Sequence, residues 1–394
     1  MAGWIQPVLS VPWPSVAGMR LLHTSDWHVG RTFHGVDLLD DQAVVLAHLA
    51  ALVAEYGVDV VAVAGDVYDR AIPNGRAVGV CMRALEQIRD AGAAIVVTSG
   101  NHDSATRLGA GGSFAQAGGL HLRTDVAEVD VPVLLADAHG EVAVYGLPYL
   151  EPDTARHTLD APAARTHAEV LAVAMDRVRA DLAARPGVRS VVLAHAFVIG
   201  ATATDSERTI SVGGVQTVPA EVFDGVDYVA LGHLHSPQVL SDRVRYSGSP
   251  LPYSFGERSH RKAAWLVDID AAGLKQVRRL DLPVVRGLSA LQGTLEQLLS
   301  DPAHAPAEGH YVSAILTDAV RPQDAMRRLQ SRFPHAVHLQ WHRYGATPQL
   351  RYAERVRGRT DTEVVTSFLT DVRSPPQPWE TDLVADGLRV GEGS

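Results

Sequence analysis

Five short apolar runs in this chain of 394 residues are each followed at once by aspartate, asparagine or histidine, and this feature restricts the fold most. The run at residues 58–64 is nearly continuous in valine and alanine, as expected for a strand buried on both faces. Residues 37–56, 76–91 and 164–184 instead place apolar side chains at helical spacing. The alternation predicts an α/β domain of two packed sheets, or one large mixed sheet, flanked by helices.

The polar residues after these runs are all of types that bind metal ions. They are Asp26 and His28, then Asp66 and Asp69, then Asn101 and His102, then His195, and finally His233 and His235. Because strands in α/β folds end at a common ligand crevice, we expect these side chains to meet there. We also expect the Asp-x-His and His-x-His pairs to lie on one side of an extended strand end.

Imidazole and carboxylate together suit Mn, Fe, Zn or Ni better than Mg alone. A carboxylate between two such clusters would bridge two metals, which clamp the oxygens of a phosphoryl displacement and activate water. Each segment alone has a simpler interpretation: His195 as a core histidine, His233 and His235 as a chance pair. The occurrence of all five at strand ends favours the metal site.

These segments resemble the calcineurin-like metallophosphoesterases, in the order in which that family presents them. Residues 19–31 (MRLLHTSDWHVGR) and 232–238 (GHLHSPQ) further resemble SbcD-type nucleases, and residues 246–257 (YSGSPLPYSFGE) resemble an SbcD segment that simpler phosphoesterases lack. The resemblance implies a two-sheet metallophosphoesterase sandwich and two divalent metal ions, usually Mn²⁺. One metal would be held by Asp26, His28, Asp66 and His235, and the other by Asp66, Asn101, His195 and His233.

Further roles follow from the same resemblance. His102 would stabilise the transition state or protonate the leaving 3′ oxygen, and Asp69 would either orient His102 or be a solvated turn carboxylate. Arg31, His34 and Arg107 would contact DNA phosphates, or else be ordinary surface charges. The formal charge of −10 argues against tight duplex binding by this chain alone.

Four regions are expected along the chain. Residues 1–18 form a non-native or disordered leader, because the first strand-like run begins directly after the second methionine, Met19. Residues 19–282 form the nuclease domain, and residues 283–345 form a smaller α+β unit at the position of the family's DNA-capping domain. In that unit we predict strands at 283–286, 311–317 and 337–343, and helices at 288–299 and 321–333. Residues 346–394 form a tail whose helix, 361–372, would dock a partner ATPase.

The leading hypothesis is a Mn²⁺-dependent DNA phosphodiester hydrolase, an ATP-gated 3′–5′ exonuclease on duplexes and an endonuclease on single strands and hairpins. By resemblance it would act as a homodimer in a heterotetramer with the SMC-like ATPase SbcC, in DNA repair, replication and recombination. A phosphodiesterase or phosphatase acting on small nucleotides, and a metal-stabilised scaffold without activity, are the alternatives. The lone Cys81 excludes an internal disulfide, and no apolar run reaches the ~20 residues that span a bilayer. We therefore expect a cytoplasmic protein without membrane contact.

Overall fold

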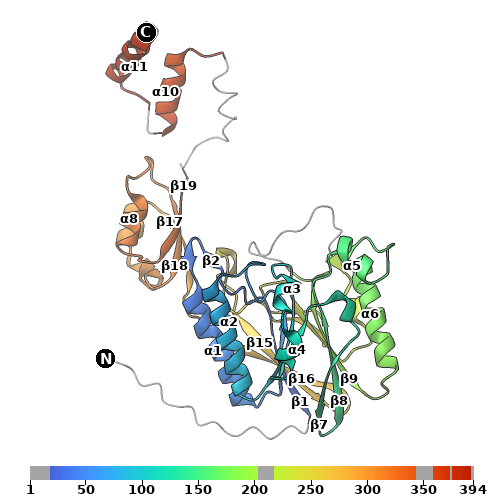
Figure 1. Ribbon diagram of the computed structural model, residues 1–394. Helices are drawn as coiled ribbons and strands as arrows, with labels where there is room; N and C mark the ends of the chain where they lie inside the picture. Colours follow the sequence, from blue (N-terminus) through green and yellow to red (C-terminus); the bar gives the residue numbers. More distant parts are fainter. Residues whose placement is uncertain (1–17, 203–216, 343–357, 373–374, 392–394) are drawn as a thin grey trace, which may run out of the picture. The chain divides into compact units, whose positions relative to one another are not determined.

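The computed structural model describes residues 18–202, 217–342, 358–372 and 375–391 (Figure 1). The chain divides into two compact units, Met1–Val285 and Arg286–Ser394. Apart from Gly18, the expected leader lies outside the described residues. Among the helices that are described, none is both long enough and apolar enough to cross a bilayer.

Two six-stranded sheets form the first unit. The first sheet has the order β16 (Gly273–Asp281), β15 (Ala263–Asp270), β1 (Met19–Thr24), β4 (Val60–Ala64), β5 (Ala94–Thr98) and β6 (Leu120–Arg123). The second has the order β13 (Gln238–Val239), β14 (Val244–Tyr246), β12 (Tyr228–Gly232), β9 (Arg189–His195), β8 (Gly140–Leu147) and β7 (Val133–Asp137). Neighbours from β1 to β6 run parallel, as do those from β14 to β8, so their carboxyl ends share one edge in each sheet.

The two sheets pack face to face over a common apolar core. Leu21 and Val60 from the first sheet meet Val191 and Tyr228 from the second, and all four are at most 1% exposed. The β-branched residues that predicted these strands supply most of this core, because their stiff side chains pack well on a pleated surface. The predicted two-sheet α/β class is confirmed.

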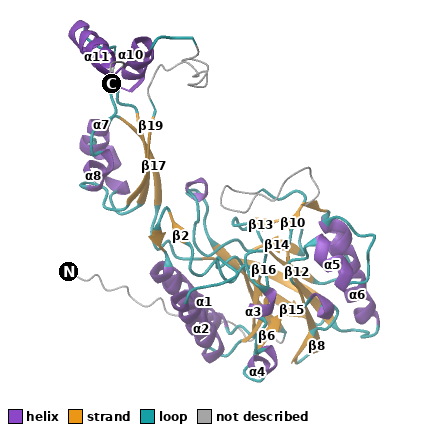
Figure 2. Ribbon diagram, turned by 45° about the horizontal axis from the view of Figure 1, so that its top comes forward, coloured by secondary structure: helices purple, strands orange, loops and turns teal. Residues whose placement is uncertain are grey.

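Helices cover the outer faces of both sheets (Figures 1 and 2). On the first sheet lie α1 (Leu39–Tyr56) and α2 (Gly75–Asp90), which also contact each other. On the second lie α5 (Pro152–Thr158) and α6 (His167–Ala183), whose buried face includes Val170, Met175 and Val178. The three helices predicted in this unit are present within a few residues of their expected bounds.

Short elements connect these layers. In the described part of this unit they are β2 (Thr32–Phe33), β3 (Val36–Asp37), α3 (Ala105–Leu108), α4 (Gly112–Gln116), β10 (Phe197–Val198), β11 (Thr217–Val218) and three short 3₁₀ helices. The 3₁₀ turn Phe255–Glu257 matters for the site, because it carries a buried glutamate.

The second unit begins with a three-stranded parallel sheet in the order β17 (Leu288–Gly293), β18 (Tyr311–Leu316) and β19 (Ala336–Trp341). Two helices, α7 (Leu295–Ser300) and α8 (Ala325–Gln330), connect its strands. Leu298, Leu316 and Phe333 are fully buried in its core. Two more helices follow, α10 (Asp361–Val372) and α11 (Pro378–Gly391), and they contact each other.

Several predictions for this unit were wrong. Residues 283–286 form no strand, and the predicted helix at 288–299 is strand β17 followed by the short helix α7. Pairing with β18 outweighs the helical spacing of the leucines, and Thr294 begins α7 with a capping box to Gln297. The helix predicted at 321–333 contracts to α8.

Candidate metal centre

The backbone at the strand ends is not extended, contrary to the sequence expectation. Asp26, His28, Asp66 and His233 have φ of +52°, +44°, +50° and +107°. Left-handed backbone costs a non-glycine residue roughly 1–2 kcal/mol. Of the seven non-glycine residues with positive φ in the described part of the chain, four are thus predicted ligands. These sharp turns, rather than alternation along a strand, aim the side chains into the crevice.

Two glycines allow the sheets to approach closely at this edge. A Cβ on Gly232, at the end of β12, would lie 1.8 Å from the carbonyl oxygen of Ala64 at the end of β4. A Cβ on Gly65, directly after β4, would lie 2.4 Å from Nδ1 of His195 at the end of β9. The strand ends of the two sheets can therefore meet only where these positions lack a side chain.

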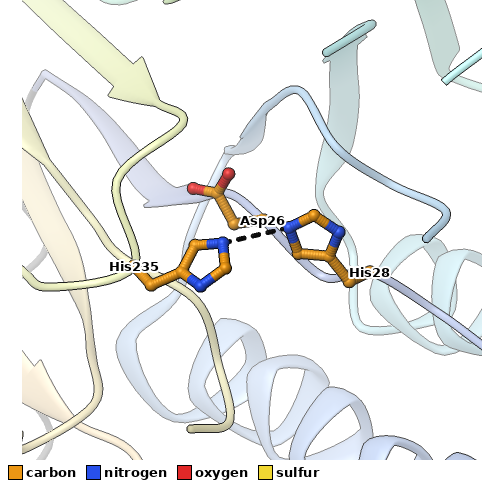
Figure 3. Close-up of side chains that lie close together, drawn as sticks. All are labelled: Asp26, His28 and His235. Carbon is orange, nitrogen blue, oxygen red and sulfur yellow. Dashed lines mark hydrogen bonds between the residues drawn. The ribbon is translucent and has the colours of Figure 1, made fainter. Parts of the chain in front are cut away.

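Three side chains from two distant segments form the first cluster (Figure 3). Nε2 of His28 lies 3.1 Å from Nε2 of His235, and Asp26 offers a carboxylate oxygen within 4.8 Å of a nitrogen on each ring. All three residues are at most 1% exposed. The His-x-His pair splits here, because His235 belongs to this cluster and His233 lies elsewhere.

The second cluster combines Asn101, His195 and His233. Oδ1 of Asn101 lies 3.0 Å from Nε2 of His195 and 3.2 Å from Nδ1 of His233. Oδ2 of Asp66 lies 3.4 Å from Nε2 of His195 and 3.5 Å from Nε2 of His28 in the first cluster. A single carboxylate oxygen therefore stands between the two clusters, where the bridging ligand was expected.

The imidazole orientations fit a divalent metal. A metal-binding histidine presents one nitrogen to the ion and directs the other towards an acceptor. Nδ1 of His195 bonds the carbonyl oxygen of Ala64 at 3.0 Å. Nδ1 of His28 and Nδ1 of His235 face the carboxylates of Asp69 and Glu257 at 3.7 and 3.6 Å. All three Nε2 atoms thus point inward, and with the central carboxylates they form the mixed donor set that transition metals prefer.

The electrostatics of the centre also suit a cation. Burial lowers the pKa of His28 well below its ordinary value and that of His233 to about 3, so both rings are neutral donors near pH 7. Burial also disfavours a charged His195, but the Asp66 carboxylate outweighs it and raises the pKa of His195 to about 9. Burial raises the pKa of Asp66, yet His195 and His28 bring it well below the usual range. The central Asp66 carboxylate is therefore held in its charged form, which attracts a cation.

His102 lies beside the first cluster. Its backbone N–H donates to Oδ1 of Asp66 at 2.8 Å, and its ring centre lies 4.6 Å from that of His28. Its Nδ1 bonds the backbone oxygen of Asp69 at 2.8 Å, so Asp69 orients His102 through its main chain. The Asp69 carboxylate instead faces Nδ1 of His28 and lies 3.4 Å from Arg31.

The three predicted DNA contacts lie in different settings. Arg31 is largely buried, between the Asp69 carboxylate and the Tyr253 ring, 5.0 Å from the ring centre. His34 is exposed and lies edge-on against Phe33. Arg107, in α3, lines an apolar groove rather than the metal crevice. Among these three, the structure thus brings only Arg31 to the predicted ligands.

Sequence reasoning missed two buried charged residues beside the first cluster, Glu257 and Lys262. Two signals were available. Lys262 is one of only two lysines in the chain, and Glu257 ends a segment already singled out for its resemblance. Neither signal by itself indicates burial, which depends on the position of β15 beside β1.

The chain is similar to known protein families and solved structures. Residues 19–237, more than half of the chain, match the family model for calcineurin-like phosphoesterases. Residues 284–373 match the SbcD_C model, described as a type 5 capsule protein repressor C-terminal domain. A solved protein from Thermus thermophilus is 14% identical, with 67% of this chain and 99% of that chain covered and a TM-score of 0.40. A dimetal phosphatase from Danio rerio is 12% identical, with 68% and 99% covered and a TM-score of 0.37.

Proposed function

We propose that this chain, which belongs to the calcineurin-like phosphoesterase family, is a metal-dependent nuclease of the SbcD type that hydrolyses DNA. The observation that carries the proposal is the joint presence of two donor clusters around Asp66 and an SbcD_C match over residues 284–373. A hydrolase of small nucleotides also needs the first feature, whereas the second supports the nuclease hypothesis.

The proposed ligands follow the two clusters. Asp26, His28 and His235 would hold one divalent ion and Asn101, His195 and His233 the other, with Asp66 shared between them. We take Mn²⁺ as the working ion, since the donor set mixes imidazole with carboxylate. When bound, the ions would supply an activated water and neutralise charge on the phosphate.

Residues other than the metal ligands would contact the phosphate and the leaving group. His102, oriented by the bond between its Nδ1 and the Asp69 carbonyl, would act on a phosphoryl oxygen or on the leaving 3′ oxygen. Arg31, held between Asp69 and Tyr253, would present positive charge to the phosphate next to the cleaved bond. His34 and Arg107, if they contact DNA, would do so farther from the centre.

Partners form part of the same proposal. An SMC-like ATPase of the SbcC type would bind the tail and gate duplex cleavage, and the unit predicted at residues 283–345 would cap the DNA. Phe368 and Trp379, on α10 and α11, are 49% and 65% exposed and would be covered by the ATPase. Ile72 and Met82, 70% and 42% exposed beside and on α2, would be covered in a homodimer.

A labelled DNA hairpin tests the activity. Wild type is expected to cut it with Mn²⁺ and to lose cutting in EDTA. His102→Ala is expected to lose most cutting, by about 10²–10⁴-fold, while His157→Ala, an exposed histidine on α5, stays at the wild-type rate. Intact DNA with rapid hydrolysis of small nucleotides would support the alternative substrate class. Full metal occupancy without hydrolysis of either, even with the ATPase added, would leave only the scaffold.

A further inference from the structure

A buried ion pair lies directly behind one predicted ligand. Glu257 is 1% exposed and Lys262 is 7% exposed, and Nζ of Lys262 contacts Oε2 of Glu257. The same Nζ donates to the backbone oxygen of His235 at 2.7 Å and to Oγ of Ser249 at 2.9 Å. Its three N–H donors therefore have three acceptors, and one of them belongs to the ligand itself.

The other oxygen of Glu257 faces the ligand's ring. Oε1 lies 3.6 Å from Nδ1 of His235 and accepts from the backbone N–H of Tyr253 at 3.2 Å and from Oγ of Ser254 at 3.3 Å. The Tyr253 ring packs edge-on against the His235 ring, with the centres 5.5 Å apart. The carboxylate is thus fixed from several sides and has little freedom to turn away from the imidazole.

We propose that Glu257 is a positioning residue that holds His235 as the Nδ1–H tautomer, with Nε2 directed at Nε2 of His28. Lys262 binds both the Glu257 carboxylate and the backbone oxygen of His235. The buried pair therefore holds His235 at its ring and at its main chain. Buried charges are stable only when paired and hydrogen-bonded, and a pair serving the core alone needs no contact with a ligand's ring and main chain. The inference rests on the metal site of the proposed function.

The first test uses wild-type protein without metal. Histidine selectively labelled with ¹⁵N is measured by NMR at pH 8, above the ordinary imidazole pKa, and His235→Gln assigns the signal. The proposal requires the Nδ1–H tautomer at His235. An Nε2–H tautomer there would overturn it without any variant of the pair having to fold.

The second test measures Mn²⁺ affinity by calorimetry. Glu257→Gln keeps the shape of the side chain but removes its charge, and we expect it to weaken binding about 10–100-fold and to reduce the Nδ1–H population. Asp268→Asn is the matched control, because Asp268 is 4% exposed and is paired with Arg20 at 2.9 Å, yet no predicted ligand contacts it. The control should lose stability and keep wild-type affinity.

Two other outcomes separate the hypotheses. Affinity of Glu257→Gln within threefold of wild type, or an equal loss in Asp268→Asn, would overturn the positioning role and leave the nuclease proposal intact. Absence of divalent metal binding by wild type would overturn the metal site, and with it the role of Glu257 towards a metal.

Discussion

Replacing Lys262 with methionine is the sharpest test of how the candidate centre is supported. The change keeps the length of the side chain and removes its cation. It leaves the Glu257 carboxylate, 1% exposed, without its cationic partner and takes the donor from Ser249 Oγ and the His235 carbonyl. Breaking a buried pair from one side costs about 3–5 kcal/mol, a large part of a domain's usual net stability of roughly 5–15 kcal/mol.

The pH dependence gives this prediction a sign. Burial raises the pKa of Glu257, but Lys262 and His235 outweigh burial and hold that pKa well below its ordinary value. In wild type this carboxylate therefore stabilises the fold above its unfolded pKa, and the contribution is lost as the pH falls towards the lower folded pKa. In Lys262→Met burial dominates and the folded pKa rises, so acidification restores stability. The deficit of the variant should shrink between pH 7.5 and 5.5.

Guanidinium unfolding followed by tryptophan fluorescence, in EDTA, measures the difference in unfolding free energy. Lys275→Met is the control, because Lys275 is the chain's other lysine and lies exposed on β16. It should change stability by no more than about 0.5 kcal/mol. Adding Glu257→Gln to Lys262→Met should recover part of the loss, since the unpaired charge is gone. A loss under about 1 kcal/mol, or one that grows at pH 5.5, would refute the reasoning.

Three further predictions concern other parts of the molecule. Gly232→Ala would place a Cβ 1.8 Å from the Ala64 carbonyl, so we expect a loss of at least about 1–3 kcal/mol and of Mn²⁺ binding, both measurable by calorimetry. Leu298→Ala opens a cavity at a fully buried position of the second unit and should cost about 2–5 kcal/mol. In Leu298→Ala, hydrolysis of a chromogenic phosphodiester by the first unit should stay at the wild-type rate. A loss of hydrolysis parallel to the loss of stability would contradict the division into two units. Mn²⁺ at a hundred times its Kd should raise the unfolding free energy by about 2.7 kcal/mol. Asp66→Asn should abolish this increase, which a rise in the unfolding temperature reports.

The sequence predicted the first unit well because its signals are local. Residues 58–64 form a nearly continuous run of valine and alanine, and such runs give buried parallel strands wherever helices cover the sheet. The polar residues at the strand ends then had to converge, since parallel strands end at one edge. Asp66 stands between the two clusters for that reason. Whether these side chains hold metal remains a prediction.

The failures have physical causes. Residues 288–293 pair with β18, a long-range contact that helical spacing cannot reveal. The strand β6 was missed because all four of its residues are only half-buried, so its apolar signal is weak. The turns at Asp26 and His28 depend on backbone bonds to the loop after β4, from Asp26 N–H to Gly65 O and from His28 N–H to Asp66 O. Tertiary contacts of this kind leave no trace in spacing.

The left-handed backbone at four predicted ligands has a consequence for how such a chain evolves. At roughly 1–2 kcal/mol each, these conformations together oppose folding by an amount comparable with much of a domain's net stability. Selection for a stable fold alone would favour glycine at Asp26, His28, Asp66 and His233. A lineage released from the need for chemistry should therefore lose these side chains early, before its buried strands change. In descendants of this chain, glycine at these four positions would mark proteins that keep the fold and have abandoned the reaction.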